Sequence, residues 1–182
     1  MKIIGLSGKR GVGKTTLADY LSAAHKFVQV SFADSLRDIA KTLFPFDLKD
    51  LSDPRVKERP YGVYDWTPRE FLINLGEFMR YHDKNYWLTK GLSRCSANET
   101  YVFDDVRYVN EADCIRSTGY GYIVRINRYE KDNPYGKNLD IPSESQLDDY
   151  KFDYVVEHCQ NTTLTSLYRQ GDILFNKFVK DI

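Results

Sequence analysis

The feature that most constrains this chain is a glycine-rich stretch between a short apolar segment and an amphipathic one. Residues 2–6 are mostly apolar, which is typical of a strand buried on both faces of a sheet. Gly8 and Gly13 follow with four residues between them, and Lys14 and Thr15 come next. Apolar residues then recur at helical spacing. The sequence therefore predicts a strand, a tight glycine-rich turn and a helix in direct succession.

The spacing Gly8-x-x-x-x-Gly13-Lys14-Thr15 is the Walker A pattern, in the strand–helix context that this pattern requires. Its glycines let the main chain curl so that N–H groups point inward at phosphate oxygens. The start of the following helix adds partial positive charge. We expect the Lys14 ammonium to reach the terminal phosphates and the Thr15 hydroxyl to hold Mg²⁺. The stretch thus predicts binding of a nucleoside triphosphate with magnesium.

A carboxylate for the metal is predicted where another strand ends. The apolar residues 101–103 are followed by Asp104 and Asp105, which is the Walker B arrangement. A carboxylate at that position can hold the hydration shell of magnesium. Asp104 is the predicted ligand and Asp105 a competitor for the role. A helix cap or a solvated acid remains an alternative for each.

Strand-like and helix-like segments alternate along the chain. The expected strands are residues 2–6, 27–32, 101–103, 122–126 and 154–156. The expected helices begin near residues 14, 35, 67, 86, 110 and 164, and either Asp34 or Ser35 is the expected cap of the second. Residues 45–66 and 129–151 are expected as loops. This order predicts an α/β fold with a five-stranded, mainly parallel sheet and helices on both faces.

The helix beginning near residue 67 has the clearest start. Thr67 is the expected N-cap, Pro68 stands at the first helical position, and Glu70 completes a capping box. The helix is expected to run to about His82. Its inward residues are expected to be Phe71, Leu75 and Phe78. The preceding helix is expected to present Leu36, Ile39, Ala40 and Leu43 as one apolar stripe.

Charge and composition exclude several functional classes. The 182 residues carry 26 Lys+Arg against 26 Asp+Glu, which argues against binding to a nucleic-acid polymer. There is no apolar run of about 18 residues, so no membrane span is expected. The three cysteines are widely spaced without a C-x-x-C pair, which indicates reduced thiols and a cytoplasmic location. The length favours one domain, residues 1–182.

Several arginines suggest a second phosphorylated substrate. Arg69 and Arg80 are about three helical turns apart and share a helix face, with Gly76 between them. The glycine predicts close approach by a planar ligand or by another backbone, and tight helix packing is the alternative. Because Arg pairs bidentately with phosphate, such arginines together with the Walker A stretch fit transfer between two phosphorylated species.

The sequence resembles the phage-type deoxynucleoside monophosphate kinases, within the adenylate-kinase-like P-loop group, over nearly its whole length. The resemblance rests on residues 8–16, 31–37, 57–58, 67–69, 75–76, 104–107, 110–112 and 142–144, and on Asn161, Leu164 and Leu167. The Asp-Asp-Val-Arg-x-x-Asn-Glu-Ala run and the Thr-Pro-Arg helix start are its most discriminating parts.

The resemblance implies an acceptor-binding region over about residues 35–95, a lid-like loop over about 127–151, and a possible homodimer in the cytoplasm of a bacteriophage's host. The implied contacts of ATP are Gly8, Lys9, Gly11, Val12, Gly13, Lys14, Thr15 and Thr16. The implied contacts of the monophosphate are Ser31, Phe32, Asp34, Arg37, Trp66, Arg69, Gly76 and Arg80. The implied catalytic residues are Lys14, Arg10, Arg107, Arg125 and Arg128. The implied metal contacts are Thr15 and Asp104.

Two other functions fit the same residues. A small-molecule kinase acting on a hydroxyl would use Asp34 as the general base. A regulatory P-loop ATPase module would use its nucleotide state to control a protein partner.

Overall fold

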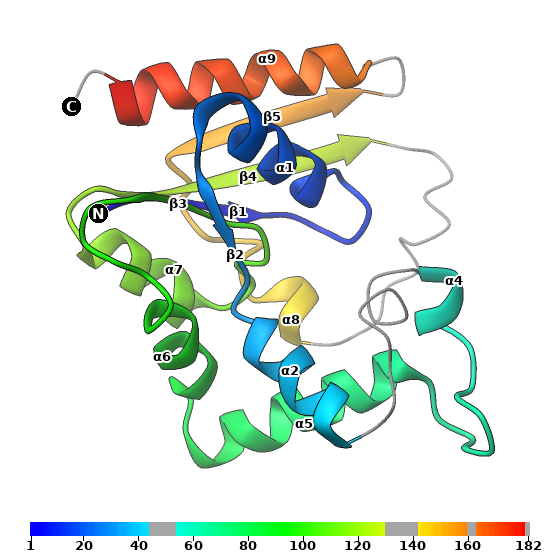
Figure 1. Ribbon diagram of the computed structural model, residues 1–182. Helices are drawn as coiled ribbons and strands as arrows, with labels where there is room; N and C mark the ends of the chain where they lie inside the picture. Colours follow the sequence, from blue (N-terminus) through cyan, green and yellow to red (C-terminus); the bar gives the residue numbers. More distant parts are fainter. Residues whose placement is uncertain (44–53, 130–141, 160–162, 181–182) are drawn as a thin grey trace. The chain divides into compact units, whose positions relative to one another are not determined.

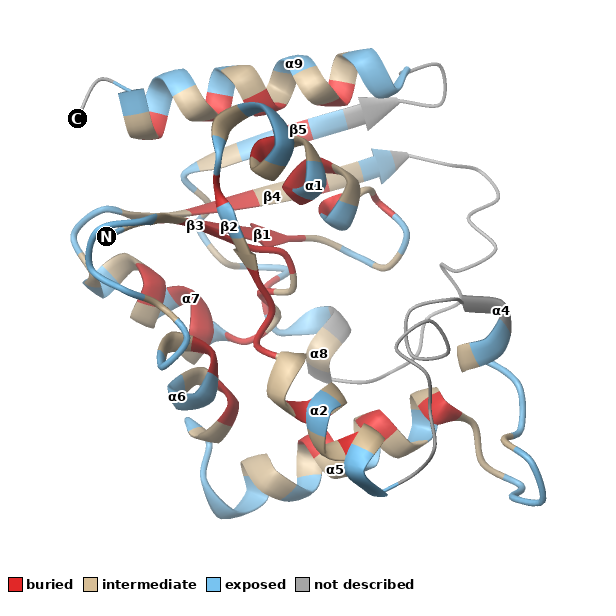
Figure 2. Ribbon diagram, viewed as in Figure 1, coloured by how far each residue is buried: buried red, intermediate tan, exposed pale blue. Residues whose placement is uncertain are grey.

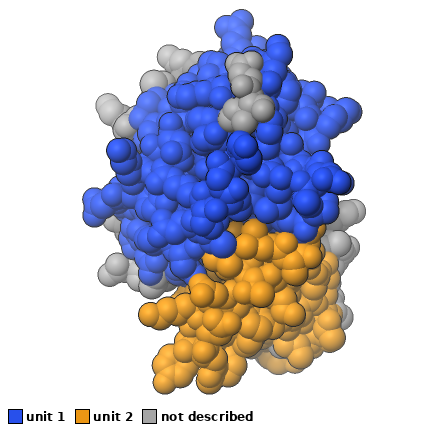
Figure 3. All heavy atoms as spheres, turned by 90° about the vertical axis from the view of Figure 1, so that its left-hand side faces the viewer, with its two compact units in different colours: residues 1–31, 95–182 blue, residues 32–94 orange. Residues whose placement is uncertain are grey.

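The computed structural model describes residues 1–43, 54–129, 142–159 and 163–180. The chain forms two compact units, shown in different colours in Figure 3. Unit 1 comprises Met1–Ser31 and Cys95–Ile182, and unit 2 comprises Phe32–Arg94. No helix among the described residues is long and apolar enough to cross a membrane.

Unit 1 is built on a five-stranded sheet with the order β2-β3-β1-β4-β5 (Figure 1). Its strands are β1 (Lys2–Ser7), β2 (Val28–Val30), β3 (Thr100–Phe103), β4 (Gly121–Tyr129) and β5 (Tyr154–Cys159). Every neighbouring pair is parallel. The predicted five-stranded α/β fold is therefore confirmed.

The strand register decides which residues meet at the carboxyl edge of the sheet. Ser7 at the end of β1 lies opposite Arg125 of β4. Phe103 at the end of β3 pairs with Gly5 of β1 and with Val30 of β2. Because all strands run the same way, the carboxyl ends of β1, β3 and β4 lie at one edge of the sheet, where α/β proteins bind their ligands.

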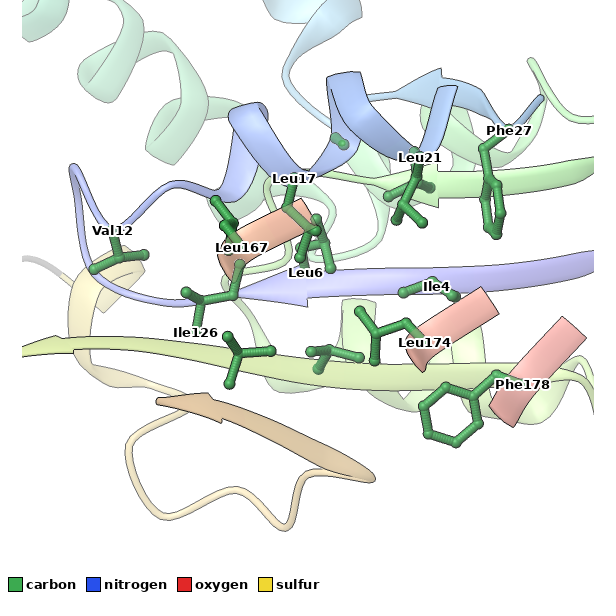
Figure 4. Close-up of a cluster of buried hydrophobic side chains, with 14 residues drawn as sticks. Ile4, Leu6, Val12, Leu17, Leu21, Phe27, Ile126, Leu167, Leu174 and Phe178 are labelled. Carbon is green, nitrogen blue, oxygen red and sulfur yellow. The ribbon is translucent and has the colours of Figure 1, made fainter. Parts of the chain in front are cut away.

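Helices cover both faces of this sheet. On one face lie α1 (Lys14–His25), α9 (Leu164–Phe175) and the π-helix η1 (Asn176–Lys180), and on the other lies α7 (Val109–Ser117) (Figure 1). Alternate β1 residues serve the two faces, as strand geometry requires. Ile4 and Leu6 join the cluster with α1 and α9 (Figure 4), whereas a Cβ at Gly5 would lie 3.0 Å from Ile115 of α7.

The core of unit 1 is almost entirely apolar. Figure 2 shows buried residues along β1, β3 and β4. One cluster of this core contains Ile4, Leu6, Val12, Leu17, Ala18, Leu21, Phe27, Val102, Val124, Ile126, Val156, Leu167, Leu174 and Phe178. Val12 belongs to the glycine-rich turn, so the cluster anchors that turn to the sheet.

Unit 2 is helical. It contains α2 (Asp34–Leu43), α4 (Pro54–Lys57), α5 (Pro68–His82) and α6 (Tyr86–Leu92). Its core is formed by Leu36, Ala40, Leu72 and Trp87. The buried Trp87 indole Nε1 donates a hydrogen bond to the Gly76 carbonyl at 3.0 Å, which fixes α6 against α5. The predicted capping box is confirmed, with reciprocal bonds between Thr67 and Glu70.

Two side chains predicted to face inward are exposed. Phe78 is 59% exposed because the buried stripe of α5 runs through Pro68, Leu72 and Gly76, and the Phe78 ring instead meets the edge of His82. Leu43 is also 59% exposed, because it is the last residue of α2, beyond the part of the helix that packs.

The two predicted loops contain regular structure at their described ends. Residues 54–57 form α4, β4 continues to Tyr129, and Pro142–Ser145 forms the short helix α8. The loop predictions are wrong there, because short polar segments can still form a helical turn or extend a paired strand. The remaining parts, residues 44–53 and 130–141, lie outside the described residues.

Candidate active site

The turn between β1 and α1 depends on its glycines. Gly8, Gly11 and Gly13 have φ values of 150°, 78° and 102°, which favour glycine. A Cβ at Gly8 would lie 2.5 Å from the carbonyl oxygen of Ile126 in β4. The turn therefore lies so close to the sheet that no side chain fits at Gly8.

The Lys14 side chain points into this turn. Lys14 begins α1 and is only 8% exposed. Its Nζ donates to the carbonyl oxygens of Gly8 at 2.7 Å and Lys9 at 2.9 Å. An ammonium group is thus held inside the main-chain turn, directly before the N-terminal N–H groups of a helix. This combination of cation and helix start is suited to an anion.

A buried carboxylate lies beside the helix start. Asp104 follows β3 and is 8% exposed. Its Oδ2 accepts from Thr15 Oγ1 at 3.4 Å and from Gln29 Nε2 at 3.0 Å, and its Oδ1 accepts from Ser31 Oγ. Asp104 therefore lies beside the Thr15 hydroxyl, the other predicted metal contact, whereas Asp105 is partly exposed.

Arg125 is held at the end of β1 by groups on three sides. Its Nη1 donates to Ser7 Oγ at 3.4 Å, its Nε to Asn127 Oδ1 at 3.3 Å, and its Nη2 to Asp148 Oδ1 at 2.9 Å. The guanidinium also lies 5.5 Å from the centre of the Phe152 ring. With its side chain only 12% exposed, Arg125 is fixed beside the residue that precedes the turn.

The other predicted cations of unit 1 also lie near the carboxyl edge of the sheet or on the segments that leave it. Arg128 Nη1 donates to the Gly11 carbonyl at 3.4 Å, so β4 contributes a second arginine to the turn. Arg10 belongs to the turn itself, and its Nη2 atom is shielded from solvent. Arg107 follows Asp104 and Asp105, and its Nη1 donates to the carbonyl of Ser143 at 3.4 Å.

The start of α7 fixes the main chain at Arg107. Glu111 is buried, and its Oε2 accepts from the backbone N–H groups of Arg107 at 2.9 Å and Tyr108 at 3.1 Å. This carboxylate completes the N-terminal cap of the helix. The backbone that carries Arg107 is therefore well defined.

Unit 2 carries the arginines predicted for the acceptor. Arg37 Nη1 donates to Asp34 Oδ1 at 2.9 Å within α2. At the start of α5, Arg69 Nε donates to Glu58. At its other end, Arg80 Nη1 lies 3.4 Å from the position that a Cβ on Gly76 would take. The glycine thus gives space to the Arg80 guanidinium, a use that the sequence alone did not suggest.

The remaining predicted acceptor contacts have varied surroundings. Trp66 is partly buried in an aromatic cluster, with its ring centre 4.8 Å from that of Tyr64 and 5.4 Å from that of Phe71. Phe32 is 2% exposed, so its side chain belongs to the packed interior. The Ser31 hydroxyl is buried against Asp104. For Ser31 the described contact is therefore to the predicted metal carboxylate.

Two residues near the turn of residues 8–13, which we call the phosphate turn, were not predicted. Gln29 supports Asp104, and Asp148 contacts both Arg125 and Lys9 Nζ, the latter at 2.7 Å. An amide that alternates with valines in β2 could have indicated Gln29, because such a side chain faces away from its apolar neighbours. Nothing in the local sequence distinguishes Asp148 from the adjacent Asp149.

Comparison with known proteins adds a relative over nearly the whole chain. A protein of Acanthamoeba polyphaga mimivirus, described as "Putative deoxynucleotide monophosphate kinase", is 32% identical over 195 residues. The alignment covers 93% of this chain and 94% of the relative. No established family profile matches the chain.

Solved structures share the fold at low sequence identity. A gluconokinase from Sinorhizobium meliloti 1021 is 14% identical with a TM-score of 0.52, covering 99% of this chain and 94% of its own. TT1252 from Thermus thermophilus is 18% identical with a TM-score of 0.50, covering 98% of both chains. These likenesses support the fold, and the mimivirus relative indicates the family.

Proposed function

The chain belongs to the deoxynucleotide monophosphate kinase family, and we propose that it transfers the γ-phosphoryl group of ATP to the phosphate of a deoxynucleoside monophosphate. The products would be a deoxynucleoside diphosphate and ADP. The observation that carries this proposal is the set of groups gathered at the turn of residues 8–13. The Lys14 ammonium points into the turn, α1 begins directly after it, and the Thr15 hydroxyl contacts the Asp104 carboxylate. ATP would bind there, through the eight predicted contacts given above.

The residues at the turn fit magnesium. Thr15 Oγ1 and Asp104 Oδ2 are 3.4 Å apart, and both are the oxygen ligands that Mg²⁺ prefers. Gln29 and Ser31 hold the Asp104 carboxylate in place. Thr15 would hold the ion directly and Asp104 its hydration shell. When bound, the ion would supply positive charge to the phosphate oxygens.

Transfer to a phosphate needs alignment and charge neutralisation more than it needs a base. The acceptor oxygen is ionised at neutral pH, so no proton has to be removed. Lys14, Arg10, Arg107, Arg125 and Arg128 would offset charge on the transferring group. Arg125 is held in place by Ser7, Asn127 and Asp148.

The acceptor would bind through unit 2. Arg37, Arg69 and Arg80 would pair with its phosphate, because a guanidinium matches two phosphate oxygens at once. The aromatic cluster around Trp66 would contribute a stacking surface for the base. A homodimer and a host-cytoplasm location stay predictions.

A panel of acceptors tests the function. Purified protein with MgATP is given each deoxynucleoside monophosphate, each ribonucleoside monophosphate, gluconate, shikimate or no acceptor, and both ADP and the phosphorylated acceptor are quantified. We expect equimolar ADP and diphosphate with at least one deoxynucleoside monophosphate. Phosphorylation of a hydroxyl compound alone, or ATP turnover that needs no acceptor, would contradict the proposal.

The rival general-base role of Asp34 has a structural alternative. The Asp34 carboxylate contacts Arg37 one helical turn later, at 2.9 Å. This contact supports a role in orienting Arg37. In the hydroxyl-kinase hypothesis, Asp34→Asn would abolish transfer. If Asp34 orients Arg37, the same change would mainly raise the KM of the monophosphate.

A further inference from the structure

Asp148 joins two cations of the phosphate turn. Its Oδ1 accepts from Arg125 Nη2 at 2.9 Å, and its Oδ2 lies 2.7 Å from Lys9 Nζ. Lys9 belongs to the turn, and Arg125 lies opposite the last residue of β1. One carboxylate therefore connects the turn with β4, using a different oxygen for each cation.

The segment that carries Asp148 is fixed on both sides. Leu147 is 3% exposed, and the Asp148 N–H donates to the Ser145 carbonyl at 3.0 Å. Two residues later, the Tyr150 hydroxyl donates to Asp113 Oδ1 of α7 at 2.8 Å, and its ring lies under the Arg116 guanidinium. The carboxylate thus stands on a packed support, as a group that positions another must.

The charge of Asp148 is maintained at neutral pH. Desolvation by burial would raise the pKa of its carboxyl, but the hydrogen bonds and charges of Lys9 and Arg125 outweigh burial and lower the pKa. The carboxylate therefore stays ionised through the pH range in which phosphates are doubly charged.

We propose that Asp148 is a positioning residue for phosphoryl transfer, which holds Arg125 and Lys9 side by side at the phosphate turn. The inference rests on the proposed function. Contacts to Ser7, Asn127 and Asp148 use one N–H each, so two of the five guanidinium N–H groups of Arg125 remain to face phosphate oxygens. Asp148 thereby orients the guanidinium without occupying it fully.

In an alternative role, Asp148 would be an internal counter-ion of Lys9 and Arg125, which the phosphates of ATP must displace. The two roles predict opposite effects. A positioning carboxylate increases turnover when ATP is bound, whereas a competing carboxylate weakens ATP binding. Each oxygen of Asp148 accepts from a different cation, and the Arg125 contact to Asp148, at 2.9 Å, is shorter than those to Asn127 and Ser7, at 3.3 and 3.4 Å, which favours positioning.

The test compares Asp148→Asn with Asp149→Asn, which removes the same charge from the next residue, an exposed one. We expect Asp148→Asn to lower kcat by about 10- to 100-fold, since small misalignments of a catalytic group have effects of this size. The KM for ATP should change less than about threefold. Asp149→Asn should match the wild type in both.

A double-mutant cycle shows whether the effect acts through Arg125. Asp148→Asn should cause little further loss in an Arg125→Ala background. Wild-type turnover in Asp148→Asn, tighter ATP binding without loss of kcat, or losses that multiply fully with those of Arg125→Ala would each overturn the inference. If Asp148→Asn does not fold, Asp148→Glu, which displaces the same charge by one methylene, is measured against the same predictions.

A readout without acceptor separates this inference from the function. In spectra of the protein with nitrogen-labelled arginine, Asp148→Asn should shift the Arg125 side-chain signal and increase the mobility of its guanidinium, and Asp149→Asn should not. An unchanged Arg125 signal overturns the inference. If the wild type phosphorylates no monophosphate but the signal shifts as expected, the proposed function fails and the positioning contact stands.

Discussion

The cations predicted to bind phosphate are held in different ways in the two units. In unit 1, Lys9 and Arg125 pair with Asp148, which lies 139 and 23 residues away in the chain. In unit 2, Arg37 and Arg80 pair with acids three residues earlier on the same helix, and Arg69 pairs with Glu58, eleven residues earlier. Long-range pairs are fixed by the sheet, whereas helix pairs are local and contribute only tenths of a kcal/mol. We infer that the phosphate turn is preorganised and that the arginines of unit 2 can exchange partners when an anion binds.

The largest expected effect tests the preorganised unit. Lys14→Ala removes the ammonium that is held by the Gly8 and Lys9 carbonyls, so transfer should fall by at least about 10³-fold. Circular dichroism and thermal unfolding should show that the fold persists. Lys151→Ala, at an exposed position, is the matched control. Near-normal turnover in Lys14→Ala would remove the turn from the mechanism.

Gly8 tests how closely the turn approaches the sheet. Gly8→Ala places a methyl group 2.5 Å from the Ile126 carbonyl oxygen and should lower the free energy of unfolding by about 3 kcal/mol or more. Gly62 also has positive φ, 61°, but a Cβ there would meet nothing within 4 Å. Gly62→Ala should therefore cost only about 1 kcal/mol. Urea unfolding of both variants measures the difference, and equal losses would refute the close approach.

Arg69 tests the exchange of partners in unit 2. Arg69→Ala should raise the KM of the monophosphate by about 10- to 100-fold, because a charge-assisted contact to phosphate is lost, while the KM of ATP stays nearly constant. Arg59→Ala, which removes an exposed arginine, is the control. A rise in the KM of ATP instead would indicate that Arg69 contacts ATP and would contradict its assignment to the monophosphate.

The smallest expected effect concerns the start of α5. Thr67→Ala removes the side-chain bond to the Glu70 N–H and should lower the free energy of unfolding by about 1 kcal/mol. Thr67→Ser keeps the hydroxyl and should retain most of that stability. Chemical denaturation of the two variants compares them. A loss in Thr67→Ser as large as in Thr67→Ala would show that the methyl group of Thr67, rather than its hydroxyl, stabilises the helix start.

Features that depend on local sequence were predictable. The Gly8–Thr15 spacing and the Thr67–Glu70 box are each short, continuous segments. In such segments the residue types themselves determine the backbone conformation. The position of Asp104 directly after a strand was predictable because an apolar run precedes it, and its role at the metal stays a prediction. The sheet followed from the alternation of elements and was found with every strand parallel.

Features that depend on tertiary packing were not predictable. On α5, Phe71 and Leu75 are partly buried against the core that contains Leu72 and Trp87, whereas Phe78 is exposed. The contact of Trp87 with Gly76 joins two helices and is not visible in the sequence of either. Likewise Asp148 and Asp149 have the same chemistry, and it is Asp148, next to the buried Leu147, that contacts Arg125. These outcomes depend on residues distant in sequence.

The closeness of Gly8 to the β4 backbone has an evolutionary consequence. At most crowded positions, a larger residue can be accommodated if the neighbouring residue is replaced by a smaller one, so the two positions change together during evolution. At Gly8 a trimmed Val12 side chain would remove one obstruction, but the nearest obstructing atom is the Ile126 carbonyl oxygen, which every amino acid carries. In a selection for suppressors of Gly8→Ala, we therefore expect true revertants to glycine rather than compensating changes at residue 126.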